Sequence, residues 1–178
     1  MAITPDTKNW TWVLDEPCTE CGLDSRTIDP RAVSSVLRDN ADAWVALLTS
    51  DGDLAARPSP DKWSPLEYGC HVRDVFRVFA GRLDAMLTSD DPAYENWDQD
   101  ATAIADDYAS QDPRTVAVDL RADAGTLADA FDAVPDDAWD RTGRRSDGAR
   151  FTVATLSRYL VHDPVHHLYD VTGRRWPQ

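Results

Sequence analysis

Apolar residues recur every three or four positions in four long stretches of the chain, and this is the period of an amphipathic α-helix. The stretches cover residues 30–52, 65–88, 113–134 and 152–172. Three of them open on start signals, which are Asp29-Pro30, Asp112-Pro113 and the capping box Ser64-Pro65-Leu66-Glu67. No alternating run of β-branched residues competes with them, so the pattern predicts an all-α protein.

Four amphipathic helices, each with one apolar stripe to bury, predict a four-helix bundle. The acidic connection 89–111, in which we expect a short helix, is longer than an antiparallel hairpin needs and predicts a crossover. Residues 135–150 are expected to form a loop. We expect a single domain over residues 1–178, with an N-terminal extension 1–29 that carries a CxxC motif and a bundle over about 30–173. The loop's arginines are expected to be solvated, although they could hold a carboxylate or phosphate: Arg141, Arg144, Arg145 and Arg150.

The net charge of −14 argues against a nucleic-acid partner and against an anionic membrane surface. The N-terminus shows no basic region followed by an apolar stretch, and there is no run of about 18 apolar residues anywhere. We therefore expect a cytoplasmic protein, either a monomer or a homodimer, that acts on small molecules.

Three of the four histidines lie in the run HDPVHHLYD, residues 162–170. His162 and His166 are spaced i, i+4, which places both imidazoles on one face of a helix. Pro164 lies between them, so either the helix is continuous and kinked, as we expect, or a new helix starts at Asp163. His71 on the second helix is the available third ligand. Three nitrogen ligands with open coordination positions are typical of a catalytic metal site.

Carboxylates at helical spacing from these histidines are candidates for orienting the imidazoles. Asp170 is four residues after His166, and Asp74 is three residues after His71. Asp163 is a candidate acid or base, although capping or solvation explains it equally well. His167 points about 100° away from His166, so we expect it outside the ligand set.

With imidazole ligands, Zn²⁺ is the first choice of metal, and Ni²⁺, Fe²⁺ or Cu²⁺ are also compatible. The segment Cys18-Thr-Glu-Cys21-Gly22 has the shape of a zinc knuckle, but the chain has no second CxxC. Three readings stay open for it: a ligand pair completed by other residues, a redox pair, or two inert thiols. Cys70, the third cysteine, is next to His71 and points to a different face.

His71 after a W…P segment, the late HxxxH pair and the opening WTWVLDEPCTECG together resemble the DinB/YfiT-like superfamily. These are metal-binding four-helix bundles that include thiol S-transferases and the metal-binding domain of mycothiol-dependent maleylpyruvate isomerase. The resemblance implies a metal that activates a low-molecular-weight thiol, of the mycothiol type, for attack on an electrophilic small molecule. The alternatives are a non-catalytic metal-organised ligand-binding or stress-response module, a redox protein that uses Cys18 and Cys21, and a hydrolase that uses metal-bound water.

Overall fold

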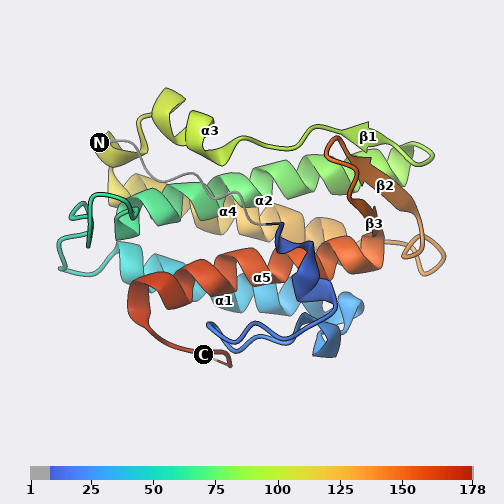
Figure 1. Ribbon diagram of the computed structural model, residues 1–178, viewed down its shortest axis with the longest axis horizontal. Coiled ribbons are helices and arrows are strands. Elements are labelled where there is room, and N and C mark those ends of the chain that lie inside the picture. Colours follow the sequence, from blue (N-terminus) through green and yellow to red (C-terminus); the bar gives the residue numbers. More distant parts are fainter. Residues whose placement is uncertain (1–8, 178) are drawn as a thin grey trace.

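The computed structural model describes residues 9–177 and contains a bundle of four long helices (Figure 1). The helices are α1 (Val33–Leu48), α2 (Pro65–Thr88), α4 (Pro113–Asp132) and α5 (Val153–Thr172). Helices α4 and α5 each pack against both α1 and α2. The predicted all-α class and four-helix bundle are confirmed. Within the described residues, no helix combines the length and apolar character needed to cross a membrane.

The start signals in the sequence act as helix caps. The Ser64 side chain accepts a hydrogen bond from the Glu67 backbone N–H, and the Glu67 carboxylate accepts one from the Ser64 N–H. Arg57 forms an ion pair with the same carboxylate. Burial alone raises the pKa of Glu67, but the Arg57 and Ser64 hydrogen bonds outweigh it and leave this pKa below its ordinary value. At the first helix, Asp29 caps a turn of 3-10 helix, η3 (Pro30–Ala32), before α1 begins at Val33.

Helix α5 continues through Pro164 without a break. The Pro164 carbonyl accepts hydrogen bonds from Trp44 Nε1 at 3.1 Å and from Asn40 Nδ2 at 3.3 Å, both buried on α1. These two hydrogen bonds fasten the turn of α5 that contains the proline to α1. The expectation of one continuous helix is confirmed, and it places residues 162, 163, 166 and 167 on adjacent turns of α5.

The connection between α2 and α4 is the expected long crossover. It contains the short helix α3 (Gln99–Ala105), a 3-10 turn η4 (Tyr108–Ser110) and the strand β1 (Ala93–Tyr94). Strand β1 pairs in parallel with β2 (Thr142–Arg145), which pairs antiparallel with β3 (Arg150–Thr152). The expectation of a loop over residues 135–150 was therefore incomplete, because strands of two to four residues are too short to show a period.

The basic segment of this hairpin is only partly solvated. The Arg145 side chain is 8% exposed and forms an ion pair with Asp147 at 2.8 Å, while its Nη1 donates to the Tyr159 hydroxyl. Arg141 donates to the backbone carbonyls of Met86 and Ser89, which holds the end of α2.

The N-terminal segment lies along α5 rather than standing apart from the bundle (Figure 1, blue). It contains η1 (Trp10–Leu14) and η2 (Ser25–Thr27), and both contact α5 together with η3. Three residues of this segment belong to the same buried core as the bundle helices: Cys18, Cys21 and Leu23. Residues 1–8 of the predicted extension lie outside the described residues.

Candidate metal centre

Two groups of metal-ligating side chains lie on neighbouring faces of α5. Asp163 and His167 meet His71 of α2, while His162 and His166 meet a cysteine pair of the N-terminal segment. In each group, one ligand atom of every residue lies within 4.8 Å of the others. Both α5 pairs are spaced i, i+4, and they differ by one residue, which is a rotation of about 100° around the helix.

The first group brings two imidazoles to one carboxylate oxygen. Nε2 of His71 lies 3.3 Å from Oδ1 of Asp163, and Nε2 of His167 lies 3.8 Å from the same oxygen. Among the described residues, neither His71 nitrogen nor this oxygen has a hydrogen-bond partner, although all three atoms are buried. A buried polar atom without a partner costs about 1–3 kcal/mol. An ion held between the three side chains would satisfy these atoms, so the donor set fits a metal.

Aromatic rings enclose this group. The Trp97 indole stacks on the His71 ring at 5.2 Å with an interplanar angle of 3°, and the Trp63 ring lies 5.2 Å from it. His71 is fully buried as a result. Nδ1 of His167 is hydrogen-bonded to Asp170 at 3.0 Å. With the proton on Nδ1 and Asp170 accepting it, the lone pair of His167 is on Nε2, which is the atom that faces Asp163.

Charge also favours the ionised form of the carboxylate in this group. Burial raises the pKa of Asp163, but the His71 and His167 imidazoles outweigh that effect and hold the pKa below its ordinary value. A carboxylate ligand must be deprotonated to bind a metal ion, so Asp163 is in the binding form at neutral pH.

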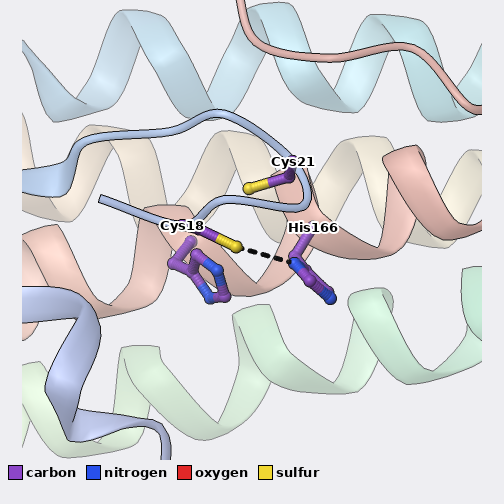
Figure 2. A group of neighbouring side chains, drawn as sticks. Cys18, Cys21 and His166 are labelled. Carbon is purple, nitrogen blue, oxygen red and sulfur yellow. Dashed lines mark hydrogen bonds between the residues drawn. The ribbon is translucent and has the colours of Figure 1, made fainter. Parts of the chain in front are cut away.

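The second group consists of Cys18, Cys21, His162 and His166, all buried. Figure 2 shows the two cysteines on one loop and His166 on α5, with Sγ of Cys18 directed at the imidazole. Sγ of Cys18 lies 3.5 Å from Nδ1 of His166. Burial lowers the pKa of His162 to about 4 and also lowers that of His166, so both imidazoles are neutral at pH 7. Burial raises the pKa of the Cys21 thiol to about 12.

A cavity of about 680 Å³ lies beside the first group. Its wall includes Asp163 and His167 of the first group and also His162 and His166 of the second group. Farther along α2 and α5 it includes Phe79, Arg82 and Tyr159. Arg82 is eleven residues after His71, which corresponds to about 16 Å along α2. The cavity therefore extends along the bundle, away from His71, and has room for a small organic molecule.

Arg82 brings a buried positive charge to this cavity. The residue is 7% exposed and its side chain donates to the Glu95 carbonyl at 3.3 Å, while its guanidinium lies over the rings of Phe79 and Tyr94. Burial lowers the pKa of Arg82, and the nearby Arg145 adds to that effect. Within residues 9–177, no carboxylate forms an ion pair with Arg82, so the cavity offers a cation for an anionic group of a ligand.

Comparison with known proteins identifies the family. The sequence matches the model of the DinB superfamily over residues 35–171, which is most of the chain. The chain belongs to the DinB superfamily. No curated protein matches the sequence. A solved structure with a similar fold is YfiT from Bacillus subtilis, described as a probable metal-dependent hydrolase with an unusual four-helix bundle topology. Its TM-score is 0.72 at 19% identity, over 83% of this chain and 87% of that chain, and this likeness shows the fold.

In this DinB chain, the three histidines predicted as one triad lie in two groups. His71 meets Asp163 and His167, whereas His162 and His166 meet the cysteines. His167, which we expected outside the ligand set, lies in the His71 group, and Asp163 is a ligand candidate rather than only an acid or base. By helical spacing alone, either the pair His162 and His166 or the pair Asp163 and His167 could face His71. The rotation of α5 about its axis decides which pair does, and packing sets that rotation.

The contacts of Asp170 and Asp74, the two carboxylates that we expected to orient imidazoles, also differ from the expectation. Asp170 bonds His167 at 3.0 Å and lies 3.7 Å from Nε2 of His166, so it contacts both groups. Asp74 does not bond His71. It accepts hydrogen bonds from Arg73, Arg77 and the Tyr108 hydroxyl instead. Two arginines within one turn of Asp74, Arg73 and Arg77, form ion pairs with its carboxylate.

Proposed function

We propose that His71, Asp163 and His167 bind one divalent metal ion and that this ion is the catalytic centre of a small-molecule enzyme. The observation that carries the proposal concerns both His71 nitrogens and Oδ1 of Asp163, which are buried without a hydrogen-bond partner among the described residues. They converge with Nε2 of His167 beside a cavity of about 680 Å³. Three protein ligands leave coordination positions open, as catalytic metal sites require. Zn²⁺ suits two imidazoles and a carboxylate, and Ni²⁺ or Fe²⁺ are compatible with the same set.

The reaction we propose is the transfer of a low-molecular-weight thiol, of the mycothiol type, to an electrophilic small molecule. When bound, the metal would lower the pKa of a thiol so that a thiolate nucleophile forms at neutral pH. The family resemblance supports the thiol, and the volume of the cavity allows a cosubstrate and an electrophile to be present together.

The chain's own residues have separate roles in this proposal. Asp170 holds the His167 ring through Nδ1, and Trp63 and Trp97 keep water away from His71. Arg82, unpaired by any described carboxylate, binds an anionic group of the substrate farther along the cavity. The substrate class is therefore an electrophile that carries a carboxylate or a similar anion.

A hydrolase is the second candidate, and the likeness to YfiT favours it, since that protein is described as a probable metal-dependent hydrolase. The same centre would then act on water instead of a thiol. The requirement for a thiol separates the two reactions, because hydrolysis of an ester panel proceeds without one.

The test compares the wild type with His167→Ala and Asp163→Asn in metal content, thiol consumption with a panel of anionic electrophiles, and ester hydrolysis. Asp112→Asn is the matched control for Asp163→Asn, because Asp112 caps α4 and asparagine caps equally well. We expect metal-dependent thiol consumption in the wild type and the control and its loss in both site variants. Hydrolysis without thiol would favour the second candidate. Bound metal without any turnover would favour a non-catalytic metal-organised module, and a metal content in both site variants that equals that of the wild type would refute the site.

A further inference from the structure

The second group on α5 contains four ligands that the proposed reaction does not use. We infer that Cys18, Cys21, His162 and His166 bind one Zn²⁺ ion in a closed structural site that fastens the N-terminal segment to α5. The four side chains are buried, with exposures of 2%, 0%, 4% and 6%. Four protein ligands of the Cys₂His₂ type are a complete tetrahedral set for structural zinc, with no position left for a substrate.

The distances suit this coordination. With Zn–S bonds of about 2.3 Å and Zn–N bonds of about 2.0 Å at tetrahedral angles, a sulfur and a nitrogen ligand lie about 3.5 Å apart. Sγ of Cys18 and Nδ1 of His166 are separated by 3.5 Å, and every pair of ligand atoms in the group lies within 4.8 Å. The side chains therefore need only small rotations to reach a common ion (Figure 2).

Without an ion, one buried nitrogen of the group has no partner in the part of the chain that the structure describes. Nε2 of His162 is buried and has no hydrogen-bond partner among the described residues. The other histidine has its remaining nitrogen occupied, because Nε2 of His166 lies 3.4 Å from the Glu20 carboxylate and 3.7 Å from Asp170. A carboxylate on the nitrogen that does not bind the metal is the usual arrangement around a metal-ligating histidine. It leaves Nδ1 of His166 for the ion.

Charge balance also suits zinc in this buried place. Two thiolates carry two negative charges, and two neutral imidazoles carry none, so one Zn²⁺ ion makes the group electrically neutral. Burying a net charge is costly, and this set avoids it. Cu²⁺ is a poorer occupant, because copper(II) favours tetragonal geometry and thiolates favour softer ions.

Backbone hydrogen bonds hold the loop that carries Cys18 and Cys21. The Cys18 N–H donates to the Leu23 carbonyl, and the Gly22 N–H donates to the Cys18 carbonyl, both at 2.8 Å. Gly22 has a φ of +84°, which glycine adopts without strain. The Cys21 carbonyl accepts a hydrogen bond from Trp176, so the C-terminal segment holds the same loop. These hydrogen bonds hold the backbone of Cys18 and Cys21 in one tight loop.

The two sites share no ligand, so they can be tested separately. Elemental analysis of the full-length protein should find two metal ions per chain in the wild type. Cys18→Ser and Cys21→Ser should each lose one zinc and keep the other ion, whereas His167→Ala should lose the other ion and keep this zinc. Cys70→Ser is the matched control, a third buried cysteine outside both groups, and should keep both ions.

Spectroscopy on protein with intact cysteines keeps the test decisive if a serine variant fails to fold. X-ray absorption at the zinc edge of His167→Ala, in which only the inferred site remains, should show two sulfur ligands at about 2.3 Å and two nitrogen ligands at about 2.0 Å. Cobalt substitution of the same variant should give thiolate-to-metal charge-transfer bands. A zinc shell without sulfur, unchanged metal content in both serine variants, or a Cys18–Cys21 disulfide in purified protein would each refute the inference. None of these results bears on the His71 site.

Discussion

His71→Leu should stabilise the metal-free protein and abolish stabilisation by metal at the first group. His71 is fully buried, and neither ring nitrogen has a hydrogen-bond partner among the described residues. Leucine has a similar size and no polar atom to satisfy. An unsatisfied buried nitrogen costs about 1–3 kcal/mol, so the variant should gain an amount of that order without metal. Oδ1 of Asp163, which faces His71, is buried, but it keeps Nε2 of His167 at 3.8 Å, and the Asp163 side chain as a whole is 32% exposed.

With metal present, the order of stabilities should reverse. An ion that binds only the folded state at 1,000 times its dissociation constant stabilises the protein by about 4.1 kcal/mol, which exceeds the gain of about 1–3 kcal/mol expected for the variant. The wild type gains this stabilisation from an ion at the His71 group, and the variant does not. Urea unfolding in chelator and in excess zinc measures both states, and any gain from a cysteine site is common to the two proteins.

His167→Leu is the matched control for this experiment. It also removes a proposed ligand, but it breaks the hydrogen bond between His167 and Asp170. Its metal-free form should therefore lose about 1 kcal/mol instead of gaining stability. The reasoning is refuted if metal-free His71→Leu is less stable than the wild type, or if zinc stabilises both proteins equally.

The remaining predictions concern the bundle and the cavity. Glu67→Gln should cost about 1.5–3 kcal/mol at pH 7, since the buried carboxylate bonds Arg57. The folded-state pKa of Glu67 is lowered, so its contribution to stability is present above pH 4.5 and is lost as the pH falls through the folded-state pKa. The free energies of unfolding of the wild type and Glu67→Gln, measured with urea, should therefore converge at that pH. Trp44→Phe should cost about 1–3 kcal/mol in the same assay, because it removes the bond to the Pro164 carbonyl and leaves a void; an unchanged midpoint would contradict this. Arg82→Met should lower kcat/KM for an anionic electrophile about tenfold or more and leave a neutral analogue unaffected, and an equal loss for both would remove Arg82 from substrate binding.

Most of the fold was predictable because its signals are local. The capping box at Ser64 and the Asp-Pro pair at 112 lie within a few residues of the helix start that they set. The period of the apolar positions then extends over whole helices. The small sheet was not predictable, because β1 and β2 come from segments about 50 residues apart and pair over two residues.

The residues of the candidate site could be predicted from the sequence, but their division into two groups could not. The residues that form the two groups were almost all singled out from the sequence, including the HxxxH pair and the CxxC. A cysteine ligand pair completed by other residues was one of the open interpretations, but nothing local in the sequence identifies His162 and His166 as the other two ligands. His71 pairs with Asp163 and His167 because of how α5 is rotated against α2, and rotation depends on packing along the whole helix.

The separation of Cys18 from His166 by 148 residues has a consequence for biosynthesis. A ribosome adds about 5–20 residues per second, so the cysteines are made about 7–30 s before the histidine that completes their ligand set. For most of that interval the nascent chain carries both cysteines without His162 and His166, the two histidines that lie beside them in the folded protein. The inferred zinc site can therefore be completed only after residue 166 has been made, so the order of synthesis separates the two halves of its ligand set in time.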